Sequence, residues 1–346
     1  MKKIISVFLA VMFFVSSFAV SSSAWGKEAL PVSAGLEQLR AQFESDKAPE
    51  TNGKELDYVY YSPVGTFDNE KYPIVIFLHG IGHGDYEGSQ LADSGMAYWA
   101  SQELQSRFSE GGAFIIMPRC PENETKYWGE SFIEPLRALI DDFIEKHADN
   151  VDTTRISITG SSQGGAMVWM MLEAYPEYFA SAFPIASTDS PTASRIEKCS
   201  SVAIWMIASK KDPIINYYLA TTPVWKNVCV YNLNPANCRL STFGTVYNPD
   251  GSKSSDNHHL AGVITYDLHM LDDSNFDGLT TVDGNGNEID ISAPNGLIKW
   301  ISEIHSDFDG VSKSEPEETS VPKLIIEVLR NLLLKVVHFV QNLLGL

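Results

Sequence analysis

Short apolar runs that alternate with segments of helical spacing constrain the fold of this chain most strongly. The runs are continuously apolar, and several stop at a glycine or a charged residue, which is typical of strands buried on both faces of a sheet. They are YPIVIFLHG, GGAFIIMPRC, RISITG, FASAFPIAS and VAIWMIASKKD. Helical spacing appears between them, in FIEPLRALIDDFIEKHA and over residues 163 to 175. Strands that alternate with helices predict an α/β fold with a mostly parallel sheet and helices on both faces.

The segments around this core set the expected domain boundaries. Residues 34 to 46 have helical spacing and predict a short helix within an N-terminal segment, 25–50. Apolar and polar residues alternate in ELDYVYYSP, which predicts a strand near the start of the main domain, 51–308. GLIKWISEIHSDF predicts a helix that closes this domain. Residues 309–322 are acidic and nearly devoid of apolar side chains, which is typical of a linker.

The first 24 residues have the composition of a secretory signal peptide. Lys2 and Lys3 precede an apolar core and a stretch of small residues, so cleavage is expected after Ala24. A membrane anchor is the alternative, but the apolar core is shorter than the ~20 residues that a span needs. We therefore expect a secreted, extracellular protein, with association with the cell surface as a further option.

The charge and the C-terminal residues limit the expected partners. The formal charge is -19 at pH 7, which disfavours binding to phosphate backbones, so no nucleic-acid partner is expected. Residues 323–346 predict an amphipathic helix with one polar stripe and a wide apolar surface. Such a helix buries its apolar surface in a membrane interface, against a second copy or on its own domain. Its three cations and one anion slightly favour an anionic membrane surface.

Export changes what the four cysteines imply. An even number of cysteines in an exported chain is compatible with two disulfides. Cys229 and Cys238 flank a short loop and are the favoured pair, whereas Cys120 and Cys199 lie farther apart in the sequence. Free, buried thiols are the alternative.

The stretch ISITGSSQGGAM contains a candidate nucleophile. It fits the G-x-S-x-G pattern with Gly160, Ser162 and Gly164, and Ser161 occupies a variable position. In this pattern the serine lies on a tight turn between a strand and a helix, where flanking side chains would clash. The N-terminus of the following helix would stabilise negative charge that develops near Ser162.

A serine nucleophile needs a base and a carboxylate that orients the base. In this fold type their order along the chain is serine, carboxylate, histidine. Asp212 follows the VAIWMIAS run and is the candidate carboxylate. His259 is the favoured base and His258 the alternative, because His269 has helical surroundings and His305 lies in the closing helix.

The loop after YPIVIFLHG is a candidate for half of an oxyanion hole. One backbone donor is expected from Gln163, the residue after the nucleophile. The other is expected from Gly80 or Ile81, because Gly80 and Gly82 let the backbone approach closely. His83 also lies in this loop. It is expected at the rim of the site and not as the base, because it precedes the serine in the chain.

These motifs resemble the alpha/beta-hydrolase superfamily, and within it the exported esterases and predicted peptidases related to feruloyl esterases and polyhydroxyalkanoate depolymerases. The matching pieces cover roughly residues 55 to 215: YPIVIFLHGIGHGD, FIIMPRCPE, YWGES, VDTTRISITGSSQGGAMVW, YPEYFASAFPIAS and ASKKDPII. The resemblance implies that Trp128 borders the substrate pocket. Members of this group often carry tryptophan three residues after the histidine, and neither His258 nor His259 does.

One segment suggests a different chemistry. DSNFDG, with Asp273, Asn275, Asp277 and Gly278, matches the first half of a calcium loop. Gly284 occupies the position of the usual bidentate glutamate, so a turn followed by a DGNG hairpin is the favoured interpretation, and no metal is expected.

The sequence therefore predicts an exported serine hydrolase that cleaves carboxylic esters through an acyl-enzyme and needs no cofactor. The expected substrate is a small ester or an acylated polymer. A serine peptidase of the prolyl-oligopeptidase type is the nearest alternative. A non-catalytic surface-binding protein on the same fold is the alternative from another class.

Overall fold

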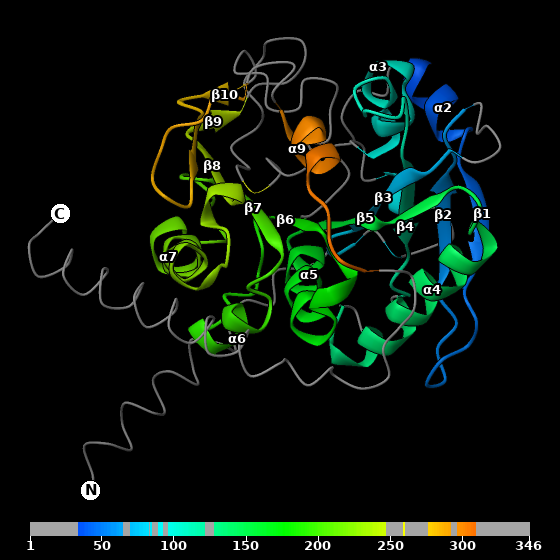
Figure 1. Ribbon diagram of the computed structural model, residues 1–346, viewed down its shortest axis with the longest axis horizontal. Helices are drawn as coiled ribbons and strands as arrows, with labels where there is room; N and C mark the ends of the chain where they lie inside the picture. The colour runs from blue at the N-terminus through cyan, green and yellow to red at the C-terminus, as the bar shows by residue number, and fades with distance from the viewer. Residues whose placement is uncertain are drawn as a thin grey trace, which may run out of the picture. The chain divides into compact units, whose positions relative to one another are not determined.

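Figure 1 presents the computed structural model of the chain. The structure describes residues 34–64, 70–82, 84, 89–92, 96–121, 128–246, 259, 276–291 and 296–308. They all belong to one compact unit, which begins at Val32. The predicted signal peptide, acidic linker and C-terminal amphipathic helix lie outside the described residues.

A nine-stranded mixed sheet with the order β1-β2-β4-β3-β5-β6-β7-β8-β11 forms the centre of this unit (Figure 1). Its inner strands run parallel: β3 (Tyr72–Leu78), β4 (Phe114–Pro118), β5 (Val151–Ser161), β6 (Ser181–Ile185), β7 (Ala203–Ser209) and β8 (Arg239–Phe243). The edges are antiparallel and consist of β1 (Glu44–Lys47), β2 (Asp57–Tyr61) and β11 (Thr280–Asp283). A separate two-stranded sheet pairs β9 (Thr245–Val246) with β10 (Phe276–Asp277). The predicted mostly parallel sheet is confirmed.

Helices cover both faces of the large sheet, as the sequence predicts. The first face packs against α4 (Ile133–Lys146), α5 (Gln163–Ala174), α6 (Ala193–Lys198) and α7 (Thr222–Tyr231). The second face packs against a 3-10 helix (Met96–Ala100), α3 (Gln102–Gln105) and α9 (Leu297–Glu303). The remaining helical segments are short: α2 (Ala34–Arg40), 3-10 turns at Ser89–Ala92, Glu130–Phe132, Pro176–Tyr178 and Pro235–Asn237, and a π-helix at Tyr217–Thr221.

The continuous apolar runs are explained by this three-layer arrangement. Every residue of β3 is buried, and its side chains alternate between the two faces of the sheet. Ile74 and Ile76 pack with α4 and α5, whereas Val75 and Phe77 pack with α3 and α9. A strand with a core on each face needs apolar residues at every position, so it does not alternate with polar residues.

The predicted helix over residues 34 to 46 is wrong in its second half. The helix α2 ends at Arg40, and residues 44–47 form β1 on the edge of the large sheet. The hydroxyl of Tyr58 donates to Asp46 Oδ2 at 2.8 Å, and Lys146 Nζ lies 2.6 Å from the same oxygen. Pairing with β2 and these side-chain contacts outweigh the weak local helical preference. The sheet therefore extends before residue 51.

All four cysteines lie within the described residues and none forms a disulfide, so the predicted bond between Cys229 and Cys238 is absent from this structure. Cys229 lies on α7, Cys238 lies buried just before β8, and Cys199 follows α6. Burial raises the pKa of each of these three thiols to about 12. The protonated thiols act as small apolar side chains of the core.

The DGNG segment forms the predicted hairpin. Asp283 Oδ1 accepts hydrogen bonds from the amides of Asn285 at 2.9 Å and Asn287 at 2.8 Å, which closes the turn after β11. Asp273 and Asn275 of the possible calcium loop lie outside the described residues. Among the residues that the structure describes, no helix is both long and apolar enough to cross a membrane.

Candidate active site

Ser162 lies on a strained turn between β5 and α5. Its φ is 55° and its ψ is -112°, a conformation that residues other than glycine rarely adopt. A Cβ on Gly164 would lie 1.8 Å from the Leu78 carbonyl oxygen, and one on Gly160 would lie 2.5 Å from the Gly164 carbonyl carbon. The two glycines of the G-x-S-x-G pattern are therefore required by close backbone contacts, and the predicted turn is confirmed.

Asp212 and His259 form a buried pair, although 46 residues separate them in the sequence. His259 Nδ1 lies 2.8 Å from Asp212 Oδ2, and the two side chains are 5% and 2% exposed. The other carboxylate oxygen of Asp212 accepts from the amides of Ile214 at 2.8 Å and Ile215 at 2.9 Å. The carboxylate is thus fixed in place, and it favours the imidazole tautomer with the proton on Nδ1, which makes Nε2 the basic nitrogen.

The candidate residues lie together where the parallel strands of the large sheet end. Because β3, β5 and β7 run parallel, their C-terminal ends lie along the same edge, and Gly80, Ser162 and Asp212 each follow one of these ends. Ligands of open α/β sheets bind outside this edge. A Cβ on Gly80 would lie 3.7 Å from the Ser162 Cβ, so the loop after β3 adjoins the elbow.

The other histidines are placed differently. The prediction that His305 lies in the closing helix is wrong, because α9 ends at Glu303. His305 Nδ1 lies 3.2 Å from Thr154 Oγ1, near the N-terminal end of β5 and thus at the other end of the parallel strands from Ser162. His258, the alternative base, lies outside the described residues, as do His83 and His269. Within the part of the chain that the structure describes, no cluster of three His, Cys, Asp or Glu side chains could hold a metal ion.

His79 organises the loop that begins at Gly80. Its Nε2 accepts from the Cys120 amide at 3.0 Å, so this nitrogen carries no proton. The proton is then on Nδ1, which donates to the Gly80 carbonyl oxygen at 2.7 Å. Trp128 is buried and donates from Nε1 to the His79 carbonyl oxygen at 3.0 Å. Trp128 thus supports the loop that carries the candidate oxyanion donors, and its contact with substrate stays a prediction.

A second anchor holds the far side of the same loop. Arg119 Nη1 donates to the Gly84 carbonyl oxygen at 3.1 Å, and the guanidinium forms a two-pronged ion pair with Asp57 at 2.6 and 2.7 Å. Between the two anchors, Ile81 is exposed and Gly82 has a φ of 87°. The backbone at Gly80 and Ile81 is therefore held from both sides, which suits a rigid group of hydrogen-bond donors.

Two groups of residues near the site were not predicted. Thr188 donates both its amide and its hydroxyl to the Ser162 carbonyl oxygen, at 3.1 and 3.3 Å. Ile214, Tyr218 and Leu219 are exposed apolar side chains within eight residues of Asp212. No sequence pattern pointed to Thr188, but the apolar residues directly after the candidate carboxylate were a signal that could have been used.

Comparison with protein-family models gives no match, and comparison with curated proteins gives none either. Solved structures do match. A thermostable esterase is 25% identical with a TM-score of 0.54, and the match covers 68% of this chain and 63% of that one. The chain has the alpha/beta-hydrolase fold. The resemblance that the sequence motifs indicated is confirmed at the level of the fold.

Two further esterases match less closely. A ferulic acid esterase from the anaerobic fungus Anaeromyces mucronatus is 19% identical, with a TM-score of 0.40 over 51% of this chain and 74% of that one. An esterase from the Planctomycetes species Thermogutta terrifontis is 13% identical, with a TM-score of 0.45 over 65% of this chain and 90% of that one.

Proposed function

We propose that this alpha/beta-hydrolase-fold protein is a serine hydrolase that cleaves carboxylic esters through an acyl-enzyme. The observation that carries the proposal is the buried Asp212–His259 pair at the same sheet edge as the strained turn of Ser162. A serine on such a turn is a poor nucleophile by itself, and a histidine oriented by a carboxylate is the group that activates it. The structural similarity to a thermostable esterase supports ester hydrolysis as the reaction.

In the proposed mechanism, Ser162 Oγ attacks the carbonyl carbon of the ester while His259 Nε2 takes the hydroxyl proton. Asp212 holds the Nδ1–H tautomer and stabilises the imidazolium that forms. The amides of Gln163 and of Gly80 or Ile81 donate to the oxyanion of the tetrahedral intermediate. His259 then returns the proton to the leaving alcohol, and the ester C–O bond breaks.

Deacylation follows the same path with water in place of the alcohol. His259 takes a proton from a water molecule, which attacks the acyl carbon bound to Ser162. The second tetrahedral intermediate collapses, releases the carboxylic acid and returns the proton to Ser162 Oγ. The reaction consumes one water per ester, and no cofactor is required for any step.

The exposed apolar side chains favour a substrate with an apolar group. Ile81 lies in the loop of the candidate oxyanion donors, and Ile214, Tyr218 and Leu219 follow the candidate carboxylate. Exposed apolar side chains grouped beside a site favour an apolar ligand over a charged one. We therefore propose an ester with an aliphatic or aromatic acyl or alcohol group, either as a small molecule or as a substituent on a polymer.

The proposal includes the cellular location and the C-terminal residues. The composition of residues 1–24 supports export, and the apolar surface of the predicted helix 323–346 supports contact with a membrane surface or a second copy. If the membrane proposal is correct, the full chain sediments with anionic vesicles, and a chain that ends at Val311 does not. Equal sedimentation of both chains would exclude the tail as the membrane contact.

Hydrolysis of a chromogenic ester by purified variants tests the proposed reaction. Ser162→Ala should lower turnover by about four orders of magnitude, because the nucleophile is lost while the fold is kept. Ser161→Ala is the matched control and should retain most of the activity. An inactive Ser161→Ala beside an active Ser162→Ala would contradict the assignment, and hydrolysis of amides in preference to esters would favour a peptidase.

A further inference from the structure

The turn that carries Ser162 needs support from outside its own helix. Ser162 and Ala186 both have a positive φ, 55° and 42°, and they lie on adjacent loops after β5 and β6. The amide of Ser162 donates to the Ile185 carbonyl oxygen at 3.0 Å, so a hydrogen bond joins the first loop to the end of β6, where the second loop begins. Strained residues keep their conformation only where the surrounding structure fixes them.

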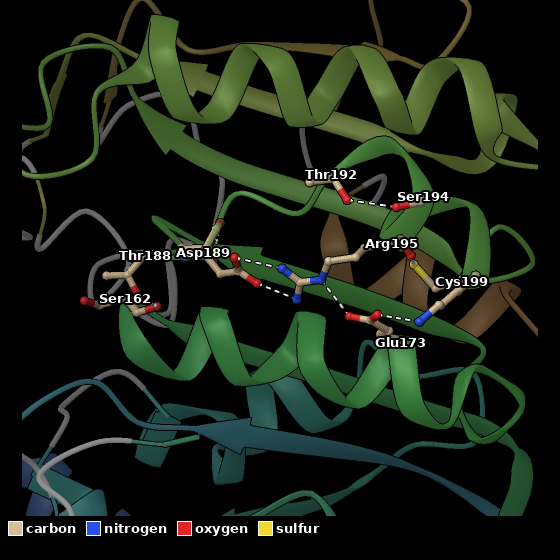
Figure 2. Close-up of polar contacts among 10 residues, drawn as sticks. Ser162, Glu173, Thr188, Asp189, Thr192, Ser194, Arg195 and Cys199 are labelled. Carbon is tan, nitrogen blue, oxygen red and sulfur yellow. Dashed lines mark hydrogen bonds and ion pairs between the residues drawn. The ribbon is translucent and has the colours of Figure 1, made fainter. Parts of the chain in front are cut away.

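The carbonyl oxygen of Ser162 receives three hydrogen bonds. One comes from the amide of Ala166 at 3.1 Å, inside α5. The other two come from Thr188, whose amide lies at 3.1 Å and whose hydroxyl lies at 3.3 Å. Figure 2 shows Thr188 beside Ser162 at the start of α5. The orientation of the Ser162 peptide therefore depends on the position of Thr188.

A charged cluster anchors the loop that carries Thr188. The next residue, Asp189, binds the guanidinium of Arg195 on α6 with both oxygens, at 2.7 and 3.0 Å. Arg195 Nε in turn donates to Glu173 in the last turn of α5 at 2.6 Å (Figure 2). Lys198 Nζ donates to the other oxygen of Glu173 at 2.6 Å. The cluster ties the loop to α6 and to the same helix that Ser162 begins.

The pKa shifts at Arg195 and Glu173 favour the ionised forms of both groups. Hydrogen bonds that Arg195 donates to Asp189 and Glu173 raise its pKa despite its partial burial. Burial by itself would raise the pKa of Glu173, but hydrogen bonds from Lys198 and Arg195 outweigh it and lower the pKa. Two-pronged pairing of a guanidinium with a carboxylate fixes the orientation as well as the distance of the partners.

Packing alone does not fix the loop. A cavity of about 20 Å³ lies between the loop and the segment before α7, lined among others by Ala186, Ser187, Asp189 and Thr221. Van der Waals contact on that side is therefore incomplete at this small void. The ion pair with Arg195 supplies the restraint from the other side.

We propose that Arg195 is a positioning residue for the nucleophile of the proposed hydrolase. It holds Asp189 against α5, which fixes the two donors of Thr188 on the Ser162 carbonyl oxygen and thereby the strained turn. Arg195 acts through Thr188 and touches no reacting atom. The inference rests on the proposed role of Ser162, and it adds a group outside the Ser162, His259 and Asp212 set.

The test compares Arg195→Met with Arg137→Met. Arg137 is a matched control, because its side chain is 27% exposed like that of Arg195 and it also pairs with two carboxylates, Glu134 and Asp141. For Arg195→Met we expect kcat on a chromogenic ester to fall about 10- to 100-fold with KM nearly unchanged, since a small displacement of a nucleophile costs that much. Arg137→Met should keep the wild-type kcat.

Further variants keep the test decisive if Arg195→Met folds poorly. Arg195→Lys retains the charge without the planar fork and should recover part of kcat. Thr188→Val removes only the hydroxyl donor and should give a smaller loss in kcat. A wild-type kcat in Arg195→Met, or an equal loss in Arg137→Met, would overturn the proposal.

Amide hydrogen exchange gives a readout that does not depend on activity. In Arg195→Met the amide of Thr188 should exchange faster, while amides in β5 keep their wild-type protection. Unchanged protection at Thr188 would overturn the positioning role even if the enzyme were slow. A wild-type protein without esterase activity, combined with faster Thr188 exchange in the variant, would instead refute the proposed function and leave the structural coupling intact.

Discussion

At the scale of single residues, the two oxygens of Asp212 have separate partners. One accepts from the amides of Ile214 and Ile215, and the other faces His259 Nδ1 at 2.8 Å. The amides fix the carboxylate, so the second oxygen is aimed at the imidazole without freedom to rotate away. Such an arrangement orients a general base and stabilises its protonated form.

This division of partners predicts the effect of Asp212→Asn. The asparagine can keep its carbonyl oxygen on the two amides, which turns its NH2 group toward His259 and favours the wrong tautomer. We expect kcat for ester hydrolysis to fall by about four orders of magnitude with little change in the melting temperature. A variant that keeps more than a tenth of the wild-type kcat would contradict the role of Asp212.

The residues of the site differ in how far the sequence predicts them. Ser162 and Asp212 follow from local patterns, because Ser162 directly follows the buried strand β5 and Asp212 lies in the loop that follows β7. The choice of His259 depends on its contact with Asp212, and no local pattern separates it from His258. Arg195 was not predicted, because its role depends on contacts between α6, α5 and the loop after β6.

At the scale of elements, the π-helix after β7 presents apolar side chains next to the site. Asn216 Oδ1 accepts from the amides of Tyr218 and Leu219 at 3.0 Å and caps the segment. The side chains of Tyr218 and Leu219 are nevertheless 69% and 79% exposed. A capped turn that holds apolar side chains outward is suited to receive an apolar part of the substrate.

Leu219→Ser tests this element. We expect kcat/KM for an octanoate ester to fall about tenfold and that for an acetate ester to change less than about twofold, because only the longer chain reaches the lost side chain. Val64→Ser is the control, since Val64 is even more exposed than Leu219 and lies away from the site. It follows β2, which runs antiparallel to β4 and so ends beside the N-terminal ends of the parallel strands. Equal effects on both esters would exclude a role in acyl recognition.

The C-terminus of α4 predicts a dependence of stability on pH. His147 ends this helix and packs against Phe143, with ring centroids 4.3 Å apart. Burial lowers the pKa of His147 below its ordinary value of 6.5, and nearby Glu44 and Asp46 oppose this only in part. The unfolded chain therefore binds more protons below about pH 6.5, so the stabilisation present at higher pH is lost as the pH falls.

His147→Phe should remove that part of the pH dependence. We expect the difference in melting temperature between pH 7.5 and pH 5 to be smaller in this variant than in the wild type. His305→Phe is the control, because His305 is an exposed residue and its replacement should leave the difference unchanged. An unchanged difference in His147→Phe would show that other groups cause the loss at low pH.

The sequence predicts the central elements better than the peripheral ones. The strands β3, β4, β6 and β7 are apolar runs that contribute to the core on both faces, whereas β5 has Ile156 and Ile158 on one face and buried Ser157 and Thr159 on the other. The helix α7 was not predicted, because TPVWKNVCVY is rich in β-branched residues that weaken a helical pattern. The short edge strands β1 and β11 depend on pairing with β2 and β8 rather than on their own composition.

At the scale of the whole molecule, the packed core provides stability without a disulfide bond. None of the described cysteines forms a disulfide, and those at positions 199, 229 and 238 are protonated members of the core. We expect the melting temperature to be the same with and without reductant. Unfolded protein that never met a reductant should titrate four thiols. Two or zero titratable thiols would show that one or two disulfides form, as the sequence at first indicated.

Above all, we infer that the fold places an activated serine where the parallel strands of the sheet end. Labelling with a fluorophosphonate probe, followed by mass spectrometry of the modified peptide, tests it most directly. We predict modification at Ser162 that is lost in His259→Ala and retained in His258→Ala. Absence of labelling in the folded protein, or modification at Ser161, would contradict the assignment of Ser162 as an activated nucleophile.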